Sequence, residues 1–166
     1  MDVFVLRHAI AFPRDAKRWP DDTQRTLTLE GVKRARRAAV GLKRMGNQPV
    51  LVLTSPLVRA RATAAIFAES ARWPEAVECT ALSPAGNPEG VLEALRRQGA
   101  KAEHVAVVGH EPHLSRLLAL SLRGDAHGEA FELKKCAIAC LRFAGPPRAG
   151  QGVLRWLLTP RILRRL

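Results

Sequence analysis

The feature that most constrains the fold is an alternation of short, unbroken apolar runs with longer segments of helical period. Three runs rich in β-branched residues end in polar or turn residues, at 3–6, 50–53 and 105–108. Unbroken apolar strands are typical of a parallel sheet that crossover helices cover on both faces. The alternation therefore predicts an α/β fold with a mostly parallel core sheet.

Helical period and turn residues place the connecting elements. Apolar residues recur every three or four positions over 29–42, and Gly46-Asn47 then provides a helix stop. We expect the next helix to use Ser55 as its N-cap and Pro56 as its first residue, and to run to Ala71.

The second half of the chain predicts two more helices and a strand pair. The helices are expected over 89–98, closed by Gly99, and from Glu111-Pro112 onward. Segments 136–143 and 153–158 flank a turn rich in Gly and Pro, so we expect an antiparallel pair there.

Length and composition favour one compact unit. The 166 residues suit a single domain spanning 1–166, and 47% apolar residues argue against disorder. The three cysteines lack metal-finger spacing and are expected to be reduced and buried. No apolar stretch is long enough to span a membrane and no secretory signal is visible, so we expect a cytoplasmic protein without membrane association.

The net charge of +12 leaves two interpretations open. A non-enzymatic basic module that binds nucleic acid or an acidic protein is one of them. The chain has no Tyr, and its five Phe and three Trp form no run that resembles an RNA-binding motif. The charge therefore favours long-range attraction of an acidic or phosphorylated protein.

Polar side chains follow each of the three apolar runs. Arg7-His8 follows the first, Ser55 and Arg59 follow the second, and His110 follows the third. Carboxyl ends of parallel strands share one edge of a sheet, where ligands bind. Two guanidinium groups repel a metal ion and grip phosphate oxygens, so the sequence predicts a phosphate or sulfate site without a metal.

The ordered motifs identify a family. Their residues are Arg7-His8-Ala9, Leu27-Thr28 with Gly31, Ser55-Pro56 with Arg59-Ala60 and Thr63, and Gly109-His110. Together they resemble the histidine phosphatase superfamily, although Ala9 stands where that family usually has glycine. The 82–84 loop, the Gly-His-Glu-Pro segment and the 137–139 strand are similar in particular to SixA-type phosphohistidine phosphatases. The resemblance implies a three-layer sandwich of the phosphoglycerate mutase-like type.

The resemblance also implies a covalent mechanism without a cofactor. His8 attacks phosphorus and forms a phosphohistidine that water releases, while Arg7 and Arg59 neutralise the equatorial oxygens. His110 adds a donor, and Ser55 supports the phosphate pocket. Attack requires a neutral imidazole, so we predict that one ring nitrogen of His8 donates to a backbone carbonyl.

The choice of substrate depends on the proton donor. In the mutase-like branch, the resemblance places a glutamate in the loop that here reads Leu82 to Gly86, without an acid. An imidazole leaves already protonated, so the gap favours phosphohistidine on a signalling protein, such as a phosphotransfer domain or phosphocarrier. Glu111 is an alternative proton donor, or else a first-turn glutamate that suits the helix dipole.

Two questions stay open at this point. Arg14 and Arg18 lie in the long loop after the first run, as possible substrate contacts or as ordinary loop charges. A small-molecule phosphomonoesterase of the same superfamily is the enzymatic alternative to a phosphohistidine phosphatase.

Overall fold

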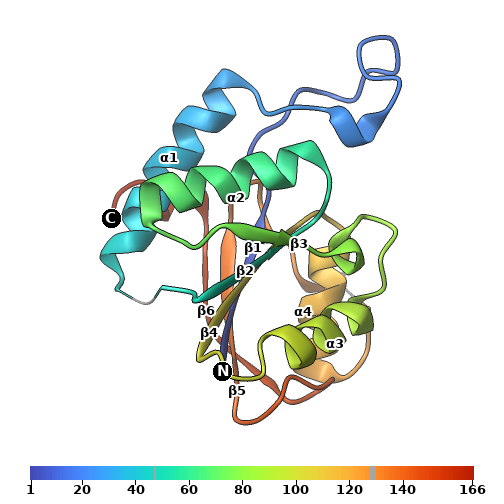
Figure 1. Ribbon diagram of the computed structural model, residues 1–166, viewed down its shortest axis with the longest axis vertical. Helices are drawn as coiled ribbons and strands as arrows, with labels where there is room; N and C mark the ends of the chain where they lie inside the picture. Colours follow the sequence, from blue (N-terminus) through green and yellow to red (C-terminus); the bar gives the residue numbers. More distant parts are fainter. Residues whose placement is uncertain (47, 128–129) are drawn as a thin grey trace.

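The computed structural model describes residues 1–46, 48–127 and 130–166 and contains one six-stranded sheet with the order β3-β2-β4-β1-β5-β6 (Figure 1). The strands are β1 Asp2–Arg7, β2 Leu51–Thr54, β3 Ala76–Glu78, β4 His104–Gly109, β5 Ile138–Phe143 and β6 Gly152–Leu158. The first four pair in parallel, whereas β5 is antiparallel to β1 and β6 is antiparallel to β5. The predicted parallel core and the predicted late strand pair are both confirmed.

Helices cover both faces of this sheet, which confirms the three-layer α/β sandwich (Figure 1). The helices are α1 Leu29–Arg44, α2 Val58–Ala71, α3 Pro88–Gln98, α4 His113–Arg123 and α5 Pro160–Leu163, with short 3-10 turns at η1 Asp22–Gln24 and η2 Thr80–Leu82. Helices α1, α2 and α5 pack on one face, and α3 and α4 pack on the other.

Strand β1 shows why the apolar runs are unbroken. Phe4 and Leu6 are buried against the face covered by α1 and α2, whereas Val3 and Val5 are buried against the face covered by α3 and α4. Successive side chains of a strand point to opposite faces, so a strand with two covered faces needs apolar residues at every position. The three cysteines are buried and free, as predicted.

The predicted start of α2 is wrong. The helix begins at Val58, with Leu57 at the N-cap position and no side-chain cap, instead of at Ser55-Pro56. The Ser55 amide continues the sheet pairing by donating to the carbonyl oxygen of Val108 over 2.9 Å. Ser55 is therefore held by the sheet and its hydroxyl serves another partner.

The other helix boundaries agree closely with the expectations. Helix α3 ends at Gln98 with Gly99 as its C-cap, and α4 begins directly after Glu111-Pro112. Helix α1 ends two residues before Gly46, which has the positive φ of 94° that favours glycine. Asn47, the second half of that predicted stop, lies outside the described residues. Across those described ranges, no helix has the length and apolar character needed to cross a membrane.

Candidate active site

His8 and His110 lie side by side at the carboxyl ends of two neighbouring strands. Strands β1 and β4 are paired in parallel, with Arg7 opposite Gly109, and each histidine directly follows its strand. The two ring centroids are 5.0 Å apart, and both side chains are buried. The sheet thus brings together two imidazoles that are about a hundred positions apart in the sequence.

A backbone hydrogen bond fixes the orientation of the His8 ring, and burial keeps the ring neutral. Its Nδ1 atom donates to the carbonyl oxygen of Ala9 over 2.7 Å, which is the backbone hydrogen bond predicted for this residue. The amide of Ala9 in turn donates to Thr63 Oγ1 over 3.0 Å. Burial, and then the charges of Arg59 and Arg7, lower the pKa of His8 to about 3 despite the opposing Ala9 bond.

His110 is positioned by Ser55. Its Nε2 atom lies 2.8 Å from the Ser55 Oγ atom, and both residues are buried. Burial, followed by the neighbouring His8 and Arg59, lowers the pKa of His110 to about 2. Ser55 therefore orients a neutral ring, which is more specific than the general pocket support expected from the sequence.

Arg59 reaches the same edge from the first turn of α2, where only 3% of its surface is exposed. Its Nη1 atom donates to the carbonyl oxygen of Asp22 over 2.8 Å, and its Nη2 atom lies 3.1 Å from Asp22 Oδ2. Burial lowers the pKa of Arg59, and Arg25 lowers it further. A carboxylate from η1 thus fixes a guanidinium from α2.

Asp22 and Arg25 are site residues that the sequence reasoning missed. Arg25 Nε donates to Asp22 Oδ1 over 2.8 Å, and this bond is the main cause of the lowered pKa of Asp22. Arg25 also lowers the pKa of His8 and His110, so its charge acts at the same site. The sequence feature that could have pointed to them is an acid and an arginine three positions apart, just before the Leu27-Thr28 motif.

Arg7 is held by the chain segment that leads into β5. Its Nη1 atom donates to the carbonyl oxygen of Leu133 over 2.6 Å, while the Leu133 amide donates to Glu111 Oε1 over 3.0 Å. Glu111 Oε2 accepts from the Ser115 hydroxyl over 2.6 Å and from the Ser115 amide over 3.2 Å. Both oxygens of Glu111 are therefore used to cap α4 and to fix the peptide that holds Arg7.

The two loop arginines have different positions. The segment that carries them projects from the body of the molecule (Figure 1). Arg14 Nε lies 3.5 Å from Asp22 Oδ1, at the outer side of the site. The Arg18 guanidinium instead lies over the Phe12 ring, 4.1 Å from its centroid. Arg14 is thus connected to the site through Asp22, whereas Arg18 packs within the loop.

The chemistry of this arrangement suits an anion. The charges of Arg59 and Arg25 act on both imidazoles, and that of Arg7 acts on His8. One of the neutral rings can act as a nucleophile, and both can accept a proton. Within the described ranges, no three His, Cys, Asp or Glu side chains are grouped to hold a metal ion.

Comparisons with known proteins agree with this geometry. The family model of the histidine phosphatase superfamily (branch 1) matches residues 3–83. An uncharacterised protein of Picosynechococcus sp. is 34% identical over 143 residues, which cover 86% of this chain and 85% of that protein.

Solved structures extend the likeness over the whole chain. The protein histidine phosphatase SixA complexed with tungstate is 27% identical with a TM-score of 0.84, covering 98% of this chain and 99% of that one. A putative phosphohistidine phosphatase SixA from Agrobacterium tumefaciens is 22% identical with a TM-score of 0.77, covering 96% of this chain and 97% of that one. A putative alpha-ribazole-5'-P phosphatase from Escherichia coli, at 17% identity and a TM-score of 0.72, covers 96% and 97% and shares the fold. The chain belongs to the histidine phosphatase superfamily, as a phosphatase-type hydrolase of the SixA kind.

Proposed function

We propose that this protein removes the phosphoryl group from phosphohistidine on another protein, with His8 as the nucleophile. The observation that carries the proposal is the fixed, neutral imidazole of His8, 5.0 Å from the His110 ring. Because Nδ1 donates to a carbonyl oxygen, the lone pair lies on Nε2. That nitrogen is ready to attack phosphorus without a separate base to deprotonate it.

The reaction then takes two steps. Nε2 of His8 forms a bond to phosphorus as the bond from phosphorus to the substrate imidazole breaks, and a substrate ring that carries a proton on its other nitrogen leaves as neutral imidazole. Water next attacks the phosphohistidine of the enzyme, which releases inorganic phosphate and restores His8. Arg7, Arg25 and Arg59 stabilise the charge on the equatorial oxygens in both transition states.

In this scheme His110 donates a hydrogen bond to the phosphoryl group. Burial, followed by the neighbouring His8 and Arg59, lowers its pKa to about 2. A bound dianion favours the protonated ring, because an opposite charge nearby raises a histidine pKa. His110, oriented by Ser55, then donates to a phosphoryl oxygen.

The hydrogen bonds and ion pairs of the carboxylates beside the site favour a substrate whose leaving group is an imidazole nitrogen. Glu111 uses both oxygens in hydrogen bonds to Ser115 and Leu133, and Asp22 is paired with arginines that lower its pKa. A carboxylate with a lowered pKa, such as Asp22, is a poor proton donor at neutral pH, and Glu111 is already engaged as an acceptor by Ser115 and Leu133. An alcohol needs such a donor in order to leave, whereas a protonated phosphoimidazole does not.

The size of the chain supports a protein substrate. Fifty-one positions separate His8 from Arg59, and the same number separates Arg59 from His110. Helices and strands take up most of the second interval, and the long irregular segment of the first interval projects from the body of the molecule (Figure 1). A histidine on the surface of a phosphotransfer domain or phosphocarrier is the substrate that we propose.

The test ranks substrates by kcat/KM. Peptides of one sequence are prepared with phosphohistidine or with phosphoserine, and p-nitrophenyl phosphate serves as a small ester, with His8→Ala as the inactive control. We expect phosphohistidine to be hydrolysed at least tenfold faster than phosphoserine, because the serine oxygen must leave without a proton donor. Each 1.4 kcal/mol that this adds to the barrier slows the reaction about tenfold. Equal or faster hydrolysis of the esters contradicts the proposal and assigns a phosphomonoesterase.

A further inference from the structure

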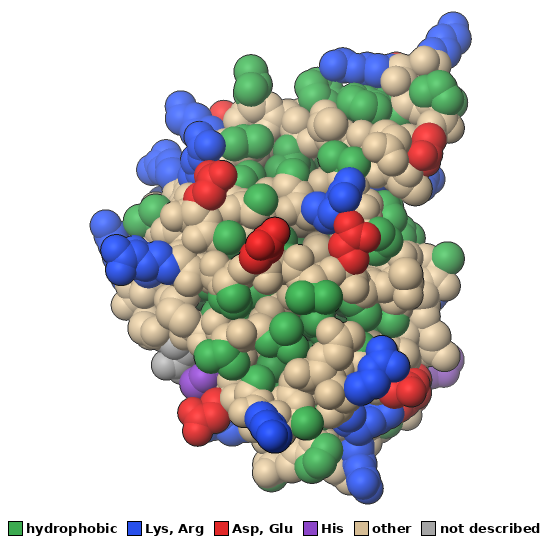
Figure 2. All heavy atoms as spheres, viewed as in Figure 1, with side chains coloured by type: hydrophobic (Ala, Val, Ile, Leu, Met, Phe, Trp, Pro, Cys, Tyr) green, Lys and Arg blue, Asp and Glu red, His purple; other side chains and the backbone are tan. Residues whose placement is uncertain are grey.

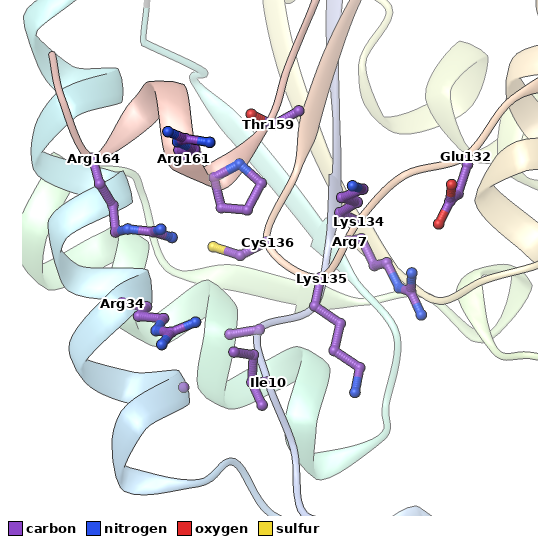
Figure 3. A pocket seen from close by; sticks show the side chains of 13 residues that line it. Arg7, Ile10, Arg34, Glu132, Lys134, Lys135, Cys136, Thr159, Arg161 and Arg164 are labelled. Atoms are coloured by element: carbon purple, nitrogen blue, oxygen red, sulfur yellow. The ribbon is translucent and has the colours of Figure 1, made fainter.

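A basic groove lies beside the active site, and Arg7 is the one basic residue of its lining that the proposed mechanism uses. It is a cavity of about 460 Å³ between α1, the segment before β5 and the start of α5, and Arg7 lines one end of it (Figure 3). Arg7 also lowers the pKa of His8, so its charge acts on the catalytic site as well. The groove and the proposed phosphate site therefore meet at Arg7.

The rim of the groove is strongly positive. Its basic residues come from four parts of the chain and are Arg7, Arg34, Lys134, Lys135, Arg161 and Arg164, against the single acid Glu132. Figure 3 shows the Arg34 and Arg164 side chains extending into the groove from α1 and the C-terminal segment. Arg34 is paired with Glu30, but among the described residues no carboxylate lies within 4.0 Å of Lys134, Lys135, Arg161 or Arg164.

The interior of the groove is neutral and partly apolar. Ile10, Pro160 and Cys136 line it, and burial raises the pKa of the Cys136 thiol to about 12. This thiol is therefore protonated and unreactive at neutral pH. Neutral, partly apolar walls with a cationic rim suit an extended ligand that places apolar side chains in the groove and negative side chains at its rim.

We propose that the groove binds an acidic segment of the phosphoprotein, next to its phosphohistidine; this inference rests on the proposed function. The cations are mostly exposed and are spread over separate segments, so they fit several carboxylates along a chain better than one compact ion. Basic residues are also spread over the face in Figure 2, so net charge alone selects no position. The groove differs because its cations surround a hollow that ends at the catalytic arginine.

Electrostatic complementarity of this kind acts mainly on encounter and on the choice of partner. Each exposed ion pair contributes little, in the range of 0 to about 1 kcal/mol, but several pairs acting together change binding about tenfold or more. The groove is therefore expected to lower KM for acidic phosphoproteins and to leave the chemical step unchanged.

The first experiment measures binding without catalysis. Two fluorescent peptides of one sequence, one with glutamates and one with glutamines at the same positions, are titrated by fluorescence anisotropy. The groove variant is Lys134→Glu/Lys135→Glu, and the control is Lys43→Glu/Lys101→Glu, which changes the net charge equally. Lys43 lies in α1 and Lys101 lies before β4, outside the groove, and all four side chains are exposed.

The expected result is a selective loss. The native protein binds the glutamate peptide more tightly than the glutamine peptide, and the preference weakens as salt is raised. The groove variant loses about tenfold in affinity for the glutamate peptide, whereas the control variant loses less than about threefold. Equal losses in the two variants, or native binding that ignores the glutamates, overturn the inference. Tighter binding of an oligonucleotide that is lost in the groove variant also overturns it, in favour of nucleic acid.

The second experiment connects the groove to turnover. Phosphohistidine peptides with glutamate or glutamine flanks are compared by kcat/KM, with p-nitrophenyl phosphate as a substrate that is too small to fill the groove. The groove variant is expected to abolish the preference for glutamate flanks through KM and to keep the native rate on p-nitrophenyl phosphate. A preference that survives in the groove variant overturns the inference. If the native enzyme hydrolyses only the small ester, the proposed function fails, while the binding experiment still decides the groove.

Discussion

Arg59 and Asp22 form a partly buried contact across two elements, with 3.1 Å between Arg59 Nη2 and Asp22 Oδ2. A second bond of 2.8 Å joins Arg59 Nη1 to the carbonyl oxygen of Asp22. The same carboxylate accepts from Arg25. One acidic residue therefore aligns two of the guanidinium groups that we propose to bind the phosphoryl group.

Replacing Asp22 with Asn is expected to lower kcat/KM by about tenfold to a hundredfold, because small misplacements of a positioning group cost up to about that much. Asp21→Asn is the matched control, since Asp21 is exposed and its carboxylate accepts from the neighbouring Thr23. Steady-state kinetics on a phosphohistidine peptide give the result. An increase in kcat/KM would show that Asp22 repels the substrate more than it orients Arg59.

Glu111→Gln tests whether Glu111 is a cap or an acid. The amide loses one of the two acceptor oxygens that bind Ser115 and Leu133, so we expect the free energy of unfolding to fall by about 1–3 kcal/mol. Because Leu133 holds Arg7, kcat also falls, by the same factor for p-nitrophenyl phosphate and for phenyl phosphate. Glu93→Gln, on the exposed side of α3, is the control. A much greater loss on phenyl phosphate, the poorer leaving group, would identify Glu111 as the proton donor.

Gly31→Ala is expected to destabilise the protein strongly. A Cβ atom at Gly31 would lie 2.1 Å from the carbonyl oxygen of Ile10, so α1 or the chain after β1 must move. Overpacking of this kind costs about 1–3 kcal/mol, and here the clash is with backbone. Gly90→Ala in α3 is the control, because its Cβ atom would lie 3.3 Å from the Ala81 side chain. Equal unfolding midpoints for the two variants in urea would contradict the expectation.

Acid is expected to destabilise the fold through the buried histidines. The pKa of His8 falls from 6.5 to about 3 on folding, and that of His110 falls to about 2. Below pH 6.5 the unfolded chain then binds more protons than the folded protein. The contribution of these histidines to the free energy of unfolding is fully present above that pH and is lost as pH falls toward the lowered pKa values. Each group adds a slope of up to about 1.4 kcal/mol per pH unit.

The control for this pH dependence is His8→Asn. Urea unfolding is measured between about pH 5 and 6.5, which avoids most of the carboxylate titration. In this range the free energy of unfolding of the variant is expected to change less steeply with pH, by the equivalent of about one proton. Identical slopes in the native protein and in His8→Asn would mean that His8 has the same pKa in both states.

The parts of the site that follow the core strands were accessible from the sequence. Apolar runs located the strands, and parallel pairing then required that His8, Ser55 and His110 share one edge. Asp22 and Arg25 were missed because they lie in an irregular segment, where no periodicity shows which residues turn toward the sheet. The contact from Asp22 to Arg59 spans 37 positions and depends on how that segment folds back.

The start of α2 shows a different limit. Ser55-Pro56 has the residue types of a helix N-terminus, but the Ser55 amide is taken by Val108 and its hydroxyl by His110. Tertiary contacts therefore overrode the local capping preference and moved the helix start to Val58. The basic groove was equally hidden, because its rim combines α1 with residues more than 90 positions away.

The most direct test of the account is to trap the covalent intermediate. The enzyme is mixed with a phosphohistidine peptide, quenched within one turnover, and digested under alkaline conditions that preserve phosphohistidine, and the phosphorylated residue is located by mass spectrometry. The account predicts phosphate on His8 of the native enzyme, and neither phosphate nor turnover in His8→Asn, whose unfolding in urea shows that it is folded. Turnover with phosphate on His110 alone, or undiminished turnover in His8→Asn, would contradict it.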